Sequence, residues 1–144
     1  MRDGEIVGEG WHEGPGTPHA EAMALARAGD RSRGATVYCT LEPCDHVGRT
    51  PPCTTALIDA GVRAVVAATQ DPNPIVDGRG FAQLRASGIE VEVGMLQAEA
   101  QRLDAAFERH VTTGRPFVTL KMALSLDGKS AASDGSSRWI SGAD

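Results

Sequence analysis

One histidine, one glutamate and two cysteines in this sequence form a set that could hold a metal ion and activate water. They are His19, Glu21, Cys44 and Cys53. A catalytic zinc site takes three protein ligands and keeps its fourth position open for water. His19, Cys44 and Cys53 offer the imidazole and thiolates that zinc accepts, and these ligands also suit iron or cobalt. Zinc held by them would supply a hydroxide-like nucleophile near neutral pH.

The spacing of the cysteines does not decide the matter alone, because eight residues separate them and short metal knuckles use roughly two to four. Their placement is more informative. His19 stands at the start of an expected helix, and Cys53 opens another, where the helix dipole favours a thiolate. Cys44 follows a strand, at the end of a sheet where ligands bind in α/β proteins. Glu21 lies near the start of the same expected helix as His19, where side chains lean toward the helix N-terminus, so it can also reach the ion. There it could accept a proton from zinc-bound water and pass it to a leaving group, as a general acid/base.

Two alternatives concern these residues. Cys39 or His46 could complete a closed structural zinc site. Cys39 alternates with Val37 and Leu41, which favours a core thiol over a ligand. Glu21 could be a solvated carboxylate that complements the helix dipole.

Strand-like and helix-like segments alternate along the chain. The expected strands are 5–11, 35–41, 62–69 and 89–93, and the expected helices are 20–28, 52–60, 80–87 and 96–111. The run 62–69 is continuously apolar, which is typical of a strand covered on both faces. Such alternation predicts a three-layer α/β domain with a mostly parallel sheet. A chain of 144 residues, 41% of them hydrophobic, suffices for one core.

Both ends of the sequence carry signals of further elements. Asp3-Gly4 is a hairpin-turn signal with no strand before it. Residues 117–126 (FVTLKMALSL) alternate like a new strand. We therefore expect one domain at 1–111, a linker at 112–116 and the start of a second domain at 117–144.

Bulk properties exclude several classes. The formal net charge of −5 disfavours a nucleic-acid partner. Three cysteines without an export signal disfavour a disulfide framework. No apolar run approaches the roughly 20 residues that span a bilayer, and no signal peptide is visible, so the expected location is cytoplasmic.

The motif residues resemble a known family. His19-Ala20-Glu21, Pro43-Cys44 and Cys53 resemble the zinc nucleobase-deaminase signature His-x-Glu…Pro-Cys-x-x-Cys, with a longer gap between the cysteines. The segment 44–53 (CDHVGRTPPC) resembles the corresponding loop of the bifunctional riboflavin-biosynthesis deaminase–reductases. Further stretches similar to that family are Gly10-Trp11-His12, Asp71-Pro72-Asn73-Pro74, Leu120-Lys121, Ser125 to Lys129, and Trp139-Ile140.

The resemblance implies a cytidine-deaminase-like three-layer αβα domain that lacks the family's usual first helix and strand, followed by the first strand of an incomplete NADPH-dependent reductase domain. It implies one zinc per chain and hydrolytic deamination of 2,5-diamino-6-ribosylamino-4(3H)-pyrimidinone 5′-phosphate, with Glu21 as proton shuttle. NADPH is expected only in a complete reductase domain, and related enzymes are oligomeric.

The same resemblance assigns substrate contacts residue by residue. It places His12, His46, Asp71 and Asn73 at the pyrimidine and ribose, Arg49 at the phosphate, and Lys121 near the substrate of the reductase domain. The planar donor fork of arginine suits a phosphate. Two alternatives stay open: a zinc deaminase of another nucleobase or nucleoside, and an inactive zinc-binding fragment.

Overall fold

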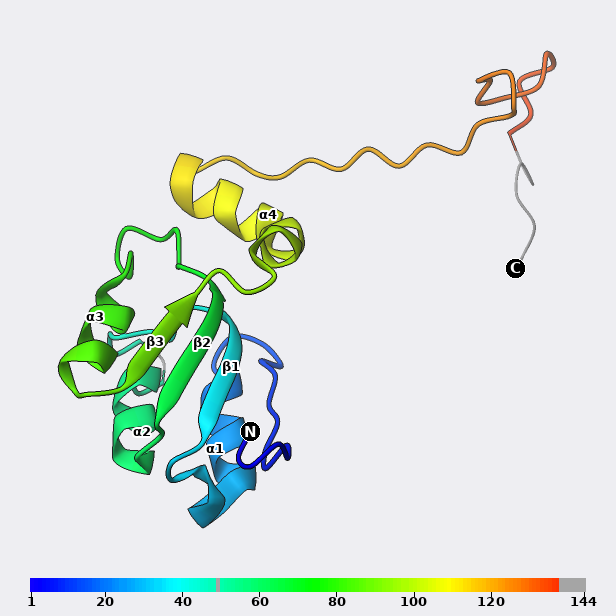
Figure 1. Cartoon of the computed structure of the whole chain (residues 1–144). Coiled ribbons are helices and arrows are strands. Elements are labelled where there is room, and N and C mark those ends of the chain that lie inside the picture. Colours follow the sequence, from blue (N-terminus) through cyan, green and yellow to red (C-terminus); the bar gives the residue numbers. More distant parts are fainter. Residues whose placement is uncertain (49, 138–144) are drawn as a thin grey trace.

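The computed structural model describes residues 1–48 and 50–137. Within these residues three parallel strands form a sheet in the order β1-β2-β3 (Figure 1). The strands are β1 (Thr36–Leu41), β2 (Ala64–Thr69) and β3 (Glu90–Val93). Their register aligns Val37, Val65 and Val91 across the sheet. The predicted α/β class with a parallel sheet is confirmed.

In the described part of the chain, four α-helices alternate with the strands. They are α1 (Ala20–Ala28), α2 (Cys53–Ala60), α3 (Arg79–Ala86) and α4 (Gln97–Thr113), and a short 3₁₀ turn (Gly29–Ser32) follows α1. α2 begins after Pro52 and ends at Gly61, which adopts the left-handed conformation (φ 66°, ψ 40°), as expected of a helix with these flanking residues. Among the helices described, none combines the length and apolarity needed to cross a membrane.

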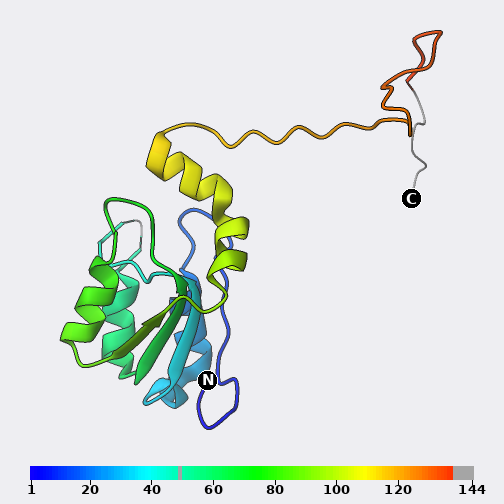
Figure 2. The same ribbon diagram turned by 45° about the horizontal axis from the view of Figure 1, so that its top comes forward.

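The helices cover the sheet on two sides. Leu57 of α2, Leu84 of α3 and Val65 of β2 belong to one buried cluster, and Leu25 of α1 packs against it. Helices α1, α2 and α3 therefore share one face. α4 contacts β2 from the other side (Figure 2), with Ala100 buried. β2 is accordingly buried along almost its whole length, as its apolar run predicts.

The prediction of a strand at residues 5–11 is wrong. Asp3-Gly4 does form the tight turn, with 2.9 Å hydrogen bonds exchanged between the backbones of Arg2 and Glu5. Beyond Glu5 the segment pairs with no strand among the described residues and instead lies against α1. A Cβ on Gly10 would fall 2.1 Å from the Ala20 carbonyl oxygen. Glycine therefore allows this segment to approach the helix backbone closely.

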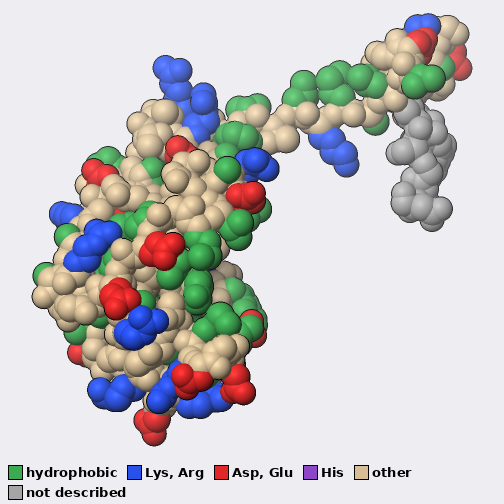
Figure 3. Space-filling view, in the orientation of Figure 1, with side chains coloured by type: hydrophobic (Ala, Val, Ile, Leu, Met, Phe, Trp, Pro, Cys, Tyr) green, Lys and Arg blue, Asp and Glu red, His purple; other side chains and the backbone are tan. Residues whose placement is uncertain are grey.

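The prediction of a strand at 117–126 is also wrong for this structure. The segment is extended but unpaired in the described part of the chain, and a strand without partners cannot bury its apolar side. Its alternating apolar side chains are exposed (Figure 3); they are Val118, Leu120, Met122, Leu124 and Leu126. α4 ends at Thr113, two residues past the expected domain boundary.

Close packing at Gly80 gives a first testable expectation. A Cβ at this position would fall 2.1 Å from the Pro43 carbonyl oxygen and 3.1 Å from a Glu42 carboxylate oxygen. The backbone oxygen cannot move away easily, so Gly80→Ala is expected to lower the free energy of unfolding by about 1–3 kcal/mol. Urea unfolding measures this. Gly48→Ala is the matched control, because a Cβ there would lie 3.9 Å from His46 Nε2, an ordinary van der Waals distance. Equal stability of the two variants would contradict the packing argument.

Candidate metal centre and active site

The structure brings His19, Cys44 and Cys53 together from three separate elements. His19 is the N-cap of α1, Cys44 follows the end of β1, and Cys53 is the first residue of α2. One ligand atom from each residue lies within 4.8 Å of the others. His19 Nδ1 is 3.3 Å from Cys53 Sγ and 3.6 Å from Cys44 Sγ. This arrangement of one imidazole and two thiols fits a zinc ion with an open fourth position.

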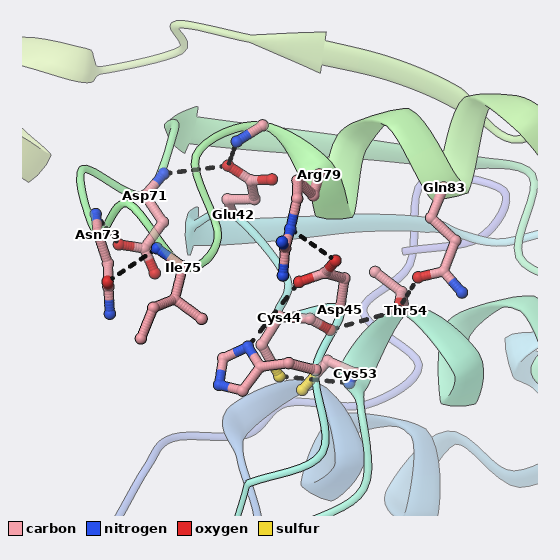
Figure 4. A network of polar contacts seen from close by, with 12 residues as sticks. Glu42, Cys44, Asp45, Cys53, Thr54, Asp71, Asn73, Ile75, Arg79 and Gln83 are labelled. Carbon is pink, nitrogen blue, oxygen red and sulfur yellow. Dashed lines mark hydrogen bonds and ion pairs between the residues drawn. The ribbon is translucent and has the colours of Figure 1, made fainter.

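The surroundings of Cys44 and Cys53 shift the pKa values of the two thiols in opposite directions. The Cys53 backbone N–H donates to Cys44 Sγ at 3.4 Å (Figure 4). The neighbouring Cys53 thiol, together with this N–H and His19, lowers the pKa of Cys44 to about 5, although burial opposes the shift. The neighbouring Cys44 thiol and burial raise the pKa of Cys53 far above its usual value. Near neutral pH Cys44 is therefore a thiolate, which is the form that binds metal.

Cys39 does not join this group. Its thiol donates to the Val66 carbonyl oxygen at 3.8 Å, and burial raises its pKa to about 12. The metal-binding group found within residues 1–48 and 50–137 comprises His19, Cys44 and Cys53 without Cys39 or His46. The geometry therefore favours the core reading of Cys39 over a closed four-ligand site.

These differences predict selective alkylation of the metal-free protein. At pH 7 iodoacetamide should modify Cys44 before the other two cysteines, because Cys44 is the thiolate and Cys53 is buried. The rate at Cys44 should change little between pH 6 and 8 and fall below about pH 5, where its thiolate takes up a proton, given its pKa of about 5. Peptide mass spectrometry follows each site, and added zinc should protect Cys44. Modification of Cys39 at an equal rate would contradict this assignment.

Glu21 lies beside the ligand group. Desolvation by burial is the largest influence on its carboxyl group and raises its pKa above the usual value. Glu21 also lines a hollow of about 710 Å³, together with His19 and Cys44. A partly buried carboxylate beside a metal group and open to a cavity can exchange protons with a bound molecule.

The other residues predicted from the sequence are distributed unevenly. His12 lies edge-on to His19, with ring centroids 5.2 Å apart, and lines both the larger hollow and a smaller one of about 210 Å³. His46 lines the smaller hollow and Asp71 the larger. Asn73 and Lys121 line neither hollow. Arg49, and with it Trp139 and Ile140, lies outside the described residues.

Three polar residues at the site were not assigned a role from the sequence motifs. Asp45 pairs with Arg79 at 3.2 Å, and its other oxygen lies 3.8 Å from His46 Nδ1. Thr54 is fully buried and donates to the Cys44 carbonyl oxygen at 3.3 Å. Glu42 is a buried carboxylate that accepts backbone N–H groups from a distant loop. The sequence feature that could have pointed to Glu42 is its position: an acidic residue between a predicted strand and the pair Pro43-Cys44.

Comparison with known proteins gives two family matches. Residues 1–69 match the cytidine and deoxycytidylate deaminase zinc-binding region, and residues 116–144 match the RibD C-terminal domain. The riboflavin biosynthesis protein RibD of Aquifex aeolicus is 54% identical over 140 residues, which is 97% of this chain and 39% of that protein. The Escherichia coli protein of the same name is 54% identical over 97% of this chain and 38% of its own length.

Solved structures agree with the sequence matches. Acinetobacter baumannii RibD, form 1, superposes with a TM-score of 0.91 at 50% identity over 99% of this chain and 40% of that chain. This chain spans about 39% of the length of the A. aeolicus relative. On the sequence identity, the paired family matches and the superposition, the chain belongs to the RibD family of riboflavin-biosynthesis deaminase–reductases.

Proposed function

We propose that the protein catalyses zinc-dependent hydrolytic deamination of 2,5-diamino-6-ribosylamino-4(3H)-pyrimidinone 5′-phosphate in riboflavin biosynthesis. The observation that carries the proposal is the convergence of His19, Cys44 and Cys53 at a hollow that His19, Cys44 and Glu21 line. The relatives add support: a Thermotoga maritima protein, 48% identical over 99% of this chain and 41% of its own length with a TM-score of 0.92, is titled a diaminohydroxyphosphoribosylaminopyrimidine deaminase/5-amino-6-(5-phosphoribosylamino)uracil reductase.

The residues divide the work as follows. His19, Cys44 and Cys53 would hold the zinc ion, which would supply activation of a water molecule near neutral pH. Glu21 takes a proton from the attacking water and delivers it to the leaving amine. A C–O bond forms at the ring carbon, the C–N bond breaks, and ammonia leaves. The raised pKa of Glu21, caused by burial, suits a group that must hold the proton between these two transfers.

Polar side chains around the two hollows would bind the rest of the substrate. His12 and His46 border the smaller hollow and Asp71 the larger, so we assign them to the pyrimidine and ribose. We also assign Asn73 to the pyrimidine and ribose, because it lies in the same loop as Asp71. Arg49 is assigned to the phosphate because the planar donor fork of arginine suits a phosphate. An aminopyrimidine carrying a phosphate is thus the proposed partner.

The second part of the proposal concerns the domains. We assign residues 1–111 to the deaminase domain, 112–116 to a linker and 117–144 to the start of a reductase domain, with Lys121 near the reductase substrate. NADPH binding, a homo-oligomer and a cytoplasmic location stay predictions.

Ammonia release from the ribosyl phosphate tests the proposal. Zinc-loaded protein is given this substrate or cytidine, and ammonia is measured in a coupled assay. Turnover of the ribosyl phosphate well above that of cytidine supports the proposal. Preferred turnover of cytidine would assign the chain to a deaminase of another nucleoside. No ammonia from either compound, in a folded sample with about one zinc per chain, would contradict deaminase activity of this chain.

A further inference from the structure

Glu42 is a buried carboxylate whose described partners are backbone amides. Its side chain lies at the end of β1, next to Pro43 and Cys44, and the residue is only 4% exposed. It accepts a hydrogen bond from the backbone N–H group of Asp71 at 3.2 Å (Figure 4). It also accepts hydrogen bonds from the backbone N–H groups of Gly78 at 3.0 Å and Phe81 at 3.2 Å. Glutamate is rarely buried without strong partners, so this carboxylate has a specific structural role.

Two of the three donors belong to the start of α3. Gly78 is the N-cap residue of α3, and no side chain of the cap bonds to the helix. Phe81 is the third residue of the helix. Glu42 therefore caps α3 from another element, where its negative charge complements the helix dipole through charge-assisted hydrogen bonds. Gly80 permits the approach, because a Cβ there would collide with the Pro43 carbonyl oxygen.

The third donor, Asp71, begins the loop at residues 71–78. This loop is folded on itself: the Asn73 backbone N–H donates to Asp71 at 2.8 Å, and the Ile75 backbone N–H donates to Asn73 at 3.1 Å. Val76 anchors its centre in the core. Glu42 binds the two ends of the loop, at Asp71 and Gly78, so one carboxylate ties the whole loop to the segment that carries Cys44.

The loop matters for the site because Asp71 lines the same hollow as Glu21 and Cys44. We propose that Glu42 is a positioning residue that holds the 71–78 loop at the wall of this hollow and thereby sets the affinity for the substrate. The substrate part of this inference rests on the proposed function. A loop fixed before binding spares the substrate the entropy cost of ordering it. The proton-transfer machinery at Glu21 lies on α1 and does not depend on these hydrogen bonds.

The test compares Glu42→Ala and Glu42→Gln with the unchanged protein in two measurements. Steady-state ammonia release should show KM raised by about ten- to a hundredfold in Glu42→Ala with a much smaller change in kcat. Glu42→Gln keeps the shape and one acceptor oxygen, so it should show a smaller rise in KM and serves if Glu42→Ala does not fold. Amide hydrogen exchange, followed by NMR without substrate, should accelerate at Asp71, Gly78 and Phe81.

Two controls separate positioning from general destabilisation. Gln70→Ala removes an exposed bond to the same loop, from the Gln70 side-chain amide to Asp77 at 2.8 Å, and should leave KM nearly unchanged. Leu84→Val perturbs the core side of α3, where Leu84 is fully buried, and should lower the melting temperature without raising KM. Metal content is measured for every variant.

The outcomes are distinct. An unchanged KM in both Glu42 variants, or a loss of rate that only follows a loss of zinc, would overturn the inference. A rise of KM in Leu84→Val equal to that in Glu42→Ala would also overturn the inference. If the unchanged protein released no ammonia from the ribosyl phosphate, the proposed function would fail, and amide exchange alone would then decide whether Glu42 holds the loop.

Discussion

Replacing Glu21 with glutamine is expected to lower kcat for ammonia release by a factor of about 10²–10⁴, the usual contribution of a general acid–base group. Glutamine preserves the size of the side chain and can still accept a hydrogen bond, but it cannot carry a proton from water to the leaving amine. Because His19, Cys44 and Cys53 remain, the variant should retain about one zinc per chain. Timed assays of ammonia release give kcat, and metal analysis of the same sample gives the zinc content per chain.

The control for this variant is Glu99→Gln, an identical change on an exposed side chain in the first turn of α4 that lines neither hollow. It should leave kcat, KM and metal content unchanged. A Glu21→Gln protein that retains both zinc and a near-normal rate would assign Glu21 to the solvated helix-start role instead.

Removal of a thiolate ligand should have the second large effect. Cys53→Ser leaves two of the three ligands, and a hydroxyl is a far poorer zinc ligand than a thiolate. We expect zinc affinity to fall by more than the roughly 10–100-fold that loss of an outer-shell partner costs, and deaminase activity to fall with it. Competition with a chromogenic chelator measures the affinity.

The third cysteine provides the matched control. Cys39→Ala removes a thiol whose contact is the Val66 carbonyl oxygen, so the variant should keep its zinc even if it loses some stability. Equal loss of zinc from Cys39→Ala and Cys53→Ser would contradict the ligand assignment. Thermal unfolding with and without zinc adds a second readout, because an ion that binds only the folded state raises the melting temperature.

Local patterns predicted much of the fold because they concern single elements. The helix expected at 20–28 coincides with α1, and the apolar run 62–69 is the buried central strand. The two failures both concern pairing. Residues 5–11 and 117–126 have strand-like patterns, but a strand also needs a neighbour, and the pattern of one segment does not say whether another lies beside it.

The candidate site divides in the same way. The convergence of His19, Cys44 and Cys53 was predictable because the three residues match a zinc-deaminase motif and stand at two helix starts and a strand end. Glu42 was not predictable, because its partners are backbone amides 29, 36 and 39 residues further along the chain and backbone groups leave no trace in the residue types. Asp45 and Thr54 were not predicted for a related reason, because their roles depend on contacts with distant residues. Asp45 pairs with Arg79, and Thr54 donates to the Cys44 carbonyl oxygen.

The opposite pKa shifts of Cys44 and Cys53 have a consequence for the calorimetry of metal uptake. Near neutral pH Cys44 is already ionised and Cys53 still holds its proton, so each zinc ion that binds should release about one proton to the buffer. The heat of binding should therefore vary with the ionisation enthalpy of the buffer with a slope of about −1, because the buffer takes up the released proton. The logarithm of the apparent affinity should likewise rise by about one for each pH unit above the range in which histidine protonates.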